Sequence, residues 1–191
     1  MTGAFALFLA LADVDSAHGR IDGDLGVAVA AGVTVGPRAP RATCDVRLRY
    51  LSTAGVFGMF EEGFSSSEPR RVLATGLEVR PLFLARWVTG HELGEPRIDL
   101  FIDSLALELG VAFVQPDGAR FRPALQAGLG LELPLFERAE GLFVGLHGGA
   151  RWSDAALAGN TGGGPADRAL FLALSLGWQE LFAGPITEAH R

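Results

Sequence analysis

The sequence is poor in charged residues and contains no lysine. Charged residues make up 20% of the 191-residue chain, and all 16 basic residues are arginine. The formal net charge is −6, whereas a nucleic-acid-binding surface must be basic to neutralise phosphates, so we expect no nucleic acid partner. The absence of lysine also excludes a Walker-type phosphate loop at the glycine-rich stretch 162–164.

Cysteine is nearly absent as well. The single Cys44 excludes an internal disulfide and a cysteine-based metal site, and we interpret it as a small apolar filler in a strand. His18 and His91 lie in polar connections, which gives no support for a metal site. The sequence therefore predicts neither a metal nor a cofactor.

Long hydrophobic runs are missing too. No stretch of about 18 apolar residues is free of charge, which excludes a transmembrane helix. Yet 49% of the residues are hydrophobic and the mean hydropathy is +0.28, which is high for a soluble domain of this size. Together these features indicate a membrane β-barrel, whose signal is spread over many alternating segments. The 26 glycines suit the crowded interior of a small barrel.

Apolar residues recur with a period of two from residue 22 onward. This pattern predicts seven strands, at about 25–35, 42–51, 72–87, 104–113, 122–135, 142–151 and 170–179. The connections expected between them are a short turn at 36–40, a polar loop at 53–70, a connection at 88–98, a hairpin at 115–118, a charged turn at 137–140 and a glycine-rich loop at 153–167. Pro81 lies inside the third run, where it predicts a bulge.

The two faces of these strands differ in a way that favours lipid contact. One face is almost entirely leucine and valine, and the other is mostly glycine, alanine and serine with isolated charges. Aromatic residues lie toward the strand ends, as in an interfacial girdle: Tyr50, Trp87, Phe113, Phe121, Phe136, Trp152 and Trp178. The alternative is a soluble lipocalin-like carrier of a small apolar ligand, in which the same period occurs with the faces reversed.

The polar face predicts a mixed set of charges in the lumen. Its members are Asp45, Arg47, Arg49, Glu78, Arg80, Glu108, Arg122, Glu132, His147 and Arg151, together with Gln126 and Gln179. Buried charges must pair, so we expect a salt-bridged plug. A narrow polar path or a small binding pocket remains the alternative, since eight strands enclose little more than their own side chains.

An even number of strands requires one more than the seven recognised. The segment 3–12 (GAFALFLALA) is either this strand or the remnant of a signal peptide, and a strand hidden between Ala54 and Asp103 is the other solution. We divide the chain into residues 1–21 (signal-peptide remnant, or first strand plus loop), a barrel domain at 22–182 and a tail at 183–191.

The whole chain resembles the small eight-stranded outer-membrane proteins of Gram-negative bacteria in architecture. Such proteins often end in an assembly signal, and Ser175, Gly177 and Phe182 match its spacing, while Glu180 departs from it. The resemblance implies an all-β fold, a closed antiparallel up-and-down transmembrane β-barrel of eight strands, located in the bacterial outer membrane. It also implies a monomer in outer-membrane lipid with a structural or interaction role.

Loop lengths predict the orientation. The long loops 53–70 and 153–167 are expected outside, where they would contact envelope or extracellular partners, together with the hairpin at Asp117. The turns at Pro37 and Glu137 and the connection at His91 are then expected in the periplasm.

A lipid-modifying enzyme is the alternative function. Small lipid A deacylases of this shape use a histidine and a serine close together in the sequence. His147 is the only histidine in a predicted strand, but Leu146, Gly148 and Gly149 surround it and no serine shares the motif. We therefore assign no catalytic residue.

Overall fold

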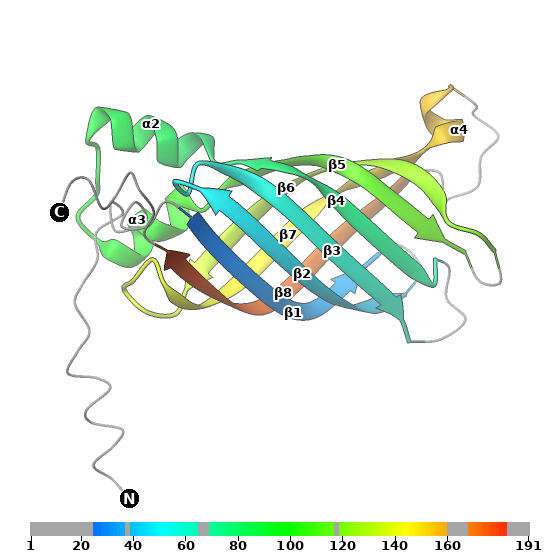
Figure 1. Ribbon diagram of the computed structural model, residues 1–191, viewed down its shortest axis with the longest axis horizontal. Helices are drawn as coiled ribbons and strands as arrows, with labels where there is room; N and C mark the ends of the chain where they lie inside the picture. Colours follow the sequence, from blue (N-terminus) through cyan, green and yellow to red (C-terminus); the bar gives the residue numbers. More distant parts are fainter. Residues whose placement is uncertain (1–24, 37–38, 65–68, 117–118, 160–167, 183–191) are drawn as a thin grey trace, which may run out of the picture.

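Each strand of the protein pairs with the next along the chain, and the last pairs with the first, in a computed structural model that describes residues 25–36, 39–64, 69–116, 119–159 and 168–182 (Figure 1). All eight pairings are antiparallel. The strands are β1 (Leu25–Val35), β2 (Pro40–Tyr50), β3 (Ala54–Gly63), β4 (Arg71–Val79), β5 (Ala106–Gln115), β6 (Arg122–Pro134), β7 (Gly141–Ser153) and β8 (Arg168–Phe182). This confirms the closed, eight-stranded, up-and-down barrel.

The pleat of each strand sorts its residues by polarity. In β8, Leu172, Leu174 and Leu176 are 50%, 57% and 54% exposed, whereas Ala173 and Ser175 between them are 2% and 4% exposed. Successive side chains of a strand point to opposite faces, so the apolar face lies outside the barrel and the polar face inside. This is the reverse of the polarity that a soluble lipocalin-like carrier requires.

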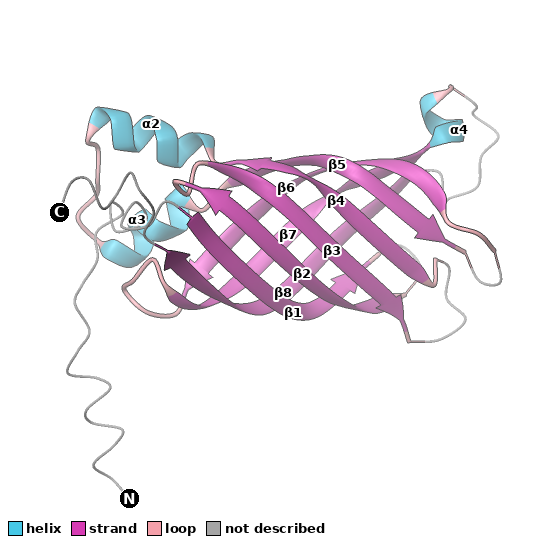
Figure 2. Cartoon of the chain, viewed as in Figure 1, coloured by secondary structure: helices cyan, strands magenta, loops and turns pink. Residues whose placement is uncertain are grey.

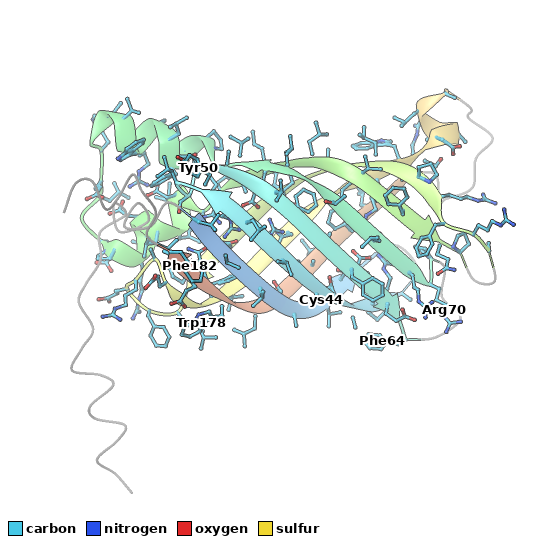
Figure 3. All side chains as sticks on the ribbon, viewed as in Figure 1. Cys44, Tyr50, Phe64, Arg70, Trp178 and Phe182 are labelled. Carbon is cyan, nitrogen blue, oxygen red and sulfur yellow. The ribbon has the colours of Figure 1, made fainter. Side chains whose placement is uncertain are left out.

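Exposed aromatic side chains lie toward both ends of the barrel. Tyr50, Trp178 and Phe182 lie toward the end where β1 begins, Phe64 lies at the opposite end, and Cys44 lies between them (Figure 3). Phe113 and Phe121 add to the second group, and Phe136 to the first. The rings of Tyr50 and Trp178 carry a polar group and favour the boundary between water and hydrocarbon. Aromatic girdles at both ends are typical of membrane β-barrels, and the phenylalanines fit this pattern.

Glycine allows β4 and β5 to approach closely. Gly76 is paired with Gly110. A Cβ on Gly76 would lie 2.3 Å from the carbonyl oxygen of Leu109, and one on Gly110 would lie 2.2 Å from that of Thr75. A larger residue would collide with backbone here, so the close approach of the two strands requires glycine at both positions.

The predicted polar loop at 53–70 is wrong over most of its length, because it contains β3. A tight turn joins β2 to β3, with Leu51 and Ser52 in the left-handed region at φ 46° and 53°. Leucine and serine seldom adopt positive φ, so the sequence does not predict the turn. The connection between β3 and β4 is shorter than expected, at residues 64–70.

The predicted strand at 72–87 is wrong beyond Val79. The chain leaves the barrel and forms α2 (Pro81–Thr89) and α3 (Pro96–Asp103), which project beyond one end of it (Figures 1 and 2). Pro81 begins α2 rather than forming a bulge, because a helix needs no backbone N–H from its first residue. A further single turn, α4 (Asp154–Leu157), follows β7. None of the helices in the described residues is long and apolar enough to cross a membrane.

The connections divide into two ends, named here for what they carry. The helical end has the connections 51–53, 80–105 and 135–140, and the loop end has 36–39, 64–70, 116–121 and 154–167. The expectation that the turn at Pro37 shares an end with His91 and Glu137 is therefore wrong. Because β3 adds one strand between β2 and β4, β1 and β2 run in the opposite direction to the one predicted from loop lengths.

The hidden-strand alternative between Ala54 and Asp103 is the correct one. β3 completes the barrel, and β1 pairs directly with β8, so no strand before residue 22 is needed. The segments assigned to 1–21 and 183–191 lie outside the described residues.

Candidate functional site

The barrel interior gathers nine of the ten charged side chains expected there. The exception is Arg122, which is exposed at the loop end of β6; it has the inward phase, but the strand begins there and leaves it in the mouth of the barrel. The interior also holds Arg41 and Glu61, which the strands predicted from the sequence do not include. We use the name lumen network for these charged residues: Arg41, Asp45, Arg47, Arg49, Glu61, Glu78, Arg80, Glu108, Glu132, His147 and Arg151.

Arg47, on β2, lies at the centre of the lumen network. Its Nη1 lies 2.6 Å from Oε2 of Glu78 and 2.6 Å from Oε1 of Glu108, and its Nε lies 3.3 Å from Oδ1 of Asp45. Its Nη2 lies 3.1 Å from Nδ1 of His147. One guanidinium thus links strands β2, β4, β5 and β7 across the interior.

Arg49 and Arg80 extend the network toward the helical end. Arg49 donates to Glu78 and to Glu132, and its Nη1 donates to Oε1 of Gln179 at 2.7 Å. Arg80 Nη2 donates to the other oxygen of Glu132 at 2.5 Å. Arg80 was expected in a strand; it instead precedes α2, and still points inward with 1% of its surface exposed.

A second cluster of the lumen network lies near the loop end. Glu61 on β3 accepts from Nε of Arg41 at 2.7 Å and from Nη2 of Arg151 at 2.6 Å. Arg151 also donates through Nε to Gln126 at 2.7 Å. The signal for Arg41 was present, since it shares the phase of Asp45, but the predicted strand began one residue too late.

Apolar groups fill the interior beside these charges. Phe57, Met59 and Phe171 form a cluster with the smaller residues Val72, Ala74, Ala112 and Ala124. The guanidinium of Arg151 lies 4.2 Å from the centre of the Phe171 ring, and that of Arg47 lies 5.7 Å from Phe57. Such contacts between cations and aromatic faces favour the buried guanidiniums.

Besides Arg47, His147 lies near Glu108 and near Ser175, and the nearness of Ser175 does not follow from the sequence. Its Nδ1 lies 2.9 Å from Oε1 of Glu108. A methyl group built on Gly145 would lie 2.7 Å from Oγ of Ser175 and 3.1 Å from Nε2 of His147, so both atoms border the same small space. Neither atom has a hydrogen-bond partner among the described residues. Ser175 comes from β8, 28 positions along the chain, and only the pairing of β7 with β8 brings it near His147.

The lumen network can fill the interior with paired charges, but its described residues do not form a group of metal ligands. It contains five arginines and five carboxylates, all buried, so the charges balance with only His147 left over. No group of three or more potential metal ligands occurs within the described part of the chain. Opposite charges that contact one another in this way stabilise an interior only as a set, because each would be costly alone.

Outside the barrel, Asp99 organises the helical insert. Its carboxylate accepts from the backbone N–H of Leu93 at 2.9 Å and of Gly94 at 3.0 Å, and from Nη2 of Arg86. Burial on its own would raise the pKa of Asp99, but the Leu93 N–H, the Arg86 guanidinium and the Gly94 N–H outweigh it and hold the pKa below its usual value. The ring of Trp87 stacks on Phe83, with centroids 6.4 Å apart, on the neighbouring helix α2.

Comparison with known proteins gives structural matches only. No protein-family model matches the chain, and no curated protein matches it in sequence. The N-terminal β-barrel domain of OprF from Pseudomonas aeruginosa matches with a TM-score of 0.53 and 11% identity, over 83% of this chain and 99% of that one. Neisserial surface protein A matches with a TM-score of 0.44 and 9% identity, over 83% and 97% of the two chains.

A third match is Ail, the attachment invasion locus protein of Yersinia pestis, solved in complex with the heparin analogue sucrose octasulfate. Its TM-score is 0.39 and its identity 10%, over 82% of this chain and 96% of that chain. Of the three, the OprF domain has the similarity on which a statement of fold can rest. With the closed sheet of eight antiparallel strands, it shows that the chain has the fold of the small eight-stranded outer-membrane β-barrels.

Proposed function

We propose that the protein is a bacterial outer-membrane β-barrel with a structural or interaction role, whose lumen is closed by the lumen network. The observation that carries this proposal is the polarity of the two faces. Leucine, valine and aromatic side chains cover the outside, and five arginines and five carboxylates are buried inside. Water would disfavour such an exterior, whereas hydrocarbon requires it.

The strand lengths support a membrane-spanning barrel. The strands have 9 to 15 residues, and a tilted transmembrane strand needs about 9–11. The girdles of exposed aromatic residues at both ends fit the two interfaces of a bilayer. Closure of the sheet leaves no unpaired strand edge in the hydrocarbon, which is the condition for any β-structure to remain there.

The lumen network supports a closed interior rather than a pore. Arg47 and Arg49 each contact at least two carboxylates, and these contacts cross the barrel. An ion passing through would have to replace contacts at 2.6 Å between fully buried partners. A barrel of eight strands is wide enough for its own side chains and little else, so we expect no continuous channel.

An interaction role would rest on the loop end. We propose that the connections 64–70 and 154–167, which replace the longer loops expected from the sequence, contact envelope or extracellular partners. In eight-stranded outer-membrane barrels both chain ends lie in the periplasm. We rest the orientation on this rule rather than on loop length, because the connection 80–105 at the helical end is longer than 64–70 or 154–167. The helical end, where β1 begins and β8 ends, would then face the periplasm.

The test is membrane fractionation combined with gel migration before and after heating. We expect the protein in the outer-membrane fraction, with faster migration unheated, because a folded barrel is compact and resists detergent. Planar bilayers then test the closed lumen, for which we expect no steady single-channel current. A protein that remains in the soluble fraction would contradict the membrane proposal, and a large steady conductance would contradict the closed lumen.

A lumen hydrolase is the second candidate, favoured by the contact of His147 with Glu108 and the position of Ser175. These are the residue types of a nucleophile, its base and the group that orients the base. Two features weigh against it: Nδ1 of His147 also lies 3.1 Å from Arg47, and Ser175 and His147 are 4% and 2% exposed. A fluorophosphonate probe would decide, since labelling of Ser175 that His147→Ala abolishes would favour the hydrolase, and we expect none.

A further inference from the structure

A pocket of about 90 Å³ opens inside the barrel at the loop end. We name it the loop-end cup. Its walls are mainly apolar, with Val72, Val114, Ala124 and Ala169 among them, and three arginines border it: Arg41, Arg122 and Arg151. Five strands, β2, β4, β5, β7 and β8, and the start of β6 therefore line this site. It adjoins the loop-end cluster of the lumen network through Arg41 and Arg151.

The loop-end cup has more positive than negative charge. Glu61 is the carboxylate beneath it, and both Arg41 and Arg151 contact this one group, at 2.7 Å and 2.6 Å. Arg122 is exposed, and within the described residues no ion pair involves it. Two guanidiniums thus share one carboxylate and a third, Arg122, is exposed nearby, which leaves positive charge on the wall of an apolar pocket.

The surroundings strengthen this positive potential. The described residues at the loop end include seven arginines, at 41, 70, 71, 120, 122, 151 and 168, and three carboxylates, at 61, 62 and 154. Arginines therefore outnumber carboxylates by seven to three among the described residues at this end. A cleft with one sign of charge and low-dielectric walls raises the local concentration of the opposite ion.

The floor of the loop-end cup matches an apolar body better than water. Val114 packs against the cluster that contains Phe57, Met59 and Phe171, and Val72 and Ala124 belong to that cluster. The Arg151 guanidinium, which borders the cup, lies 4.2 Å from the centre of the Phe171 ring. A ligand there would meet hydrocarbon on one side and guanidinium on the other.

We propose that the loop-end cup binds a small organic anion, a carboxylate, sulfonate or phosphate attached to a short apolar body. Arginine is the side chain that recognises such planar or tetrahedral anions through paired N–H donors. The volume limits the apolar part to about one ring or a few methylenes, because apolar cavities that hold benzene measure about 150 Å³ and this one is smaller but open. This goes beyond a structural role, which needs no ligand.

The test uses the full chain folded in nanodiscs of zwitterionic lipid, with benzoate as the probe and benzyl alcohol as its neutral counterpart. Methyl resonances of Val72 and Val114 report the position of binding. We expect a saturable shift with benzoate that is weaker at high salt, and none with benzyl alcohol at the same concentrations. Absence of saturable binding, or equal binding of the alcohol, would overturn the proposal.

Two variants and a matched control locate the site. Arg122→Gln should weaken benzoate binding by about tenfold or more, since it removes a charged donor from an exposed position that the fold does not need. Ala124→Phe should fill the cup and abolish binding. Arg168→Gln, which removes an exposed arginine of the same end outside the cup, should have no effect; equal weakening by both arginine variants would mean nonspecific attraction and overturn the site.

The source of the anion is tested by palmitate incorporated in the nanodisc. We expect no competition with benzoate, because a long acyl chain does not fit a pocket of this volume and the lipid-facing surface lies on the outside of the strands. Displacement of benzoate by palmitate would overturn the assignment to a small soluble anion. Neither result depends on the closed lumen, so failure here and failure of the proposed function are distinguishable.

Discussion

Nη2 of Arg80 lies 2.5 Å from Oε2 of Glu132 and joins the residue before α2 to β6. The other oxygen of Glu132 accepts from Arg49, so one carboxylate contacts two guanidiniums that are each 2% exposed or less. Glu132 therefore connects the lumen network with the start of the helical insert.

Glu132→Gln should destabilise the barrel strongly. The substitution keeps the shape of the side chain but removes the carboxylate that pairs with Arg80, while Arg49 keeps Glu78. Leaving a buried charge uncompensated costs about 3–5 kcal/mol. Urea unfolding in lipid vesicles measures the change. The control is Glu137→Gln, because Glu137 pairs with Arg97 at 3.6 Å on the exposed surface, where about 0–1 kcal/mol is expected. Equal effects of the two variants would mean that Glu132 is not a buried counter-ion.

The outward face is tested by an arginine scan along β8. Leu174 lies near the middle of the strand and Leu170 near its loop end, and both are exposed, at 57% and 72%. In a bilayer, Leu174→Arg should cost about 2–4 kcal/mol and Leu170→Arg only about 0–1, because the cost depends on depth. The free energy of folding into vesicles measures both. A loss that is the same at the two positions would contradict a lipid-facing belt.

The close approach of β4 and β5 makes a prediction about glycine. Gly76→Ala would place a Cβ 2.3 Å from a backbone oxygen. Relieving this clash requires a shift of paired backbone, so we expect the free energy of unfolding to fall by about 1–3 kcal/mol. Gly58→Ala is the matched control, since a Cβ there meets nothing within 4 Å. Thermal unfolding in detergent compares the two variants. If they melt alike, the close approach of β4 and β5 does not depend on the glycine pair.

The helical insert should loosen in acid. The pKa of Asp99 is lower in the folded chain than its ordinary value of about 3.9, so its stabilising effect is complete above that value and is lost as the pH falls through the lower, folded pKa. Fluorescence of Trp87 reports this when Trp152 and Trp178 are replaced by Phe. Asp99→Asn should loosen the insert already at neutral pH and remove the acid transition. An unchanged acid transition in that variant would assign it to another group.

The alternation of β8 shows why the barrel could be predicted from sequence. Leu172, Leu174 and Leu176 alternate with Ala173, Ser175 and Gly177, and since lipid and lumen are such different surroundings, this contrast predicts both strand and face. The same phase assigned Arg47, Arg49 and Glu78 to the interior, where the structure has them.

β3 and the helices show where this reasoning stops. In β3 the inward face includes Phe57 and Met59 and the outward face Val56 and Phe60, so both faces are apolar and the period of two is hidden. In α2 the odd-numbered positions Phe83 and Trp87 continue the phase of β4, and the change to a helix depends on where the wall of the barrel ends. The approach of Ser175 to His147 depends on strand register, which a single sequence does not specify here.

The native Cys44 tests the central claim, that the leucine face lies in lipid, without any mutation. It is an exposed residue in the middle of β2, on the outward face between the two aromatic girdles (Figure 3). A fluorophore attached to this single thiol before folding into vesicles should be quenched strongly by lipids brominated deep in their acyl chains. It should be quenched only weakly by iodide added from the water. Strong quenching by iodide with no effect of the brominated lipids would contradict the account.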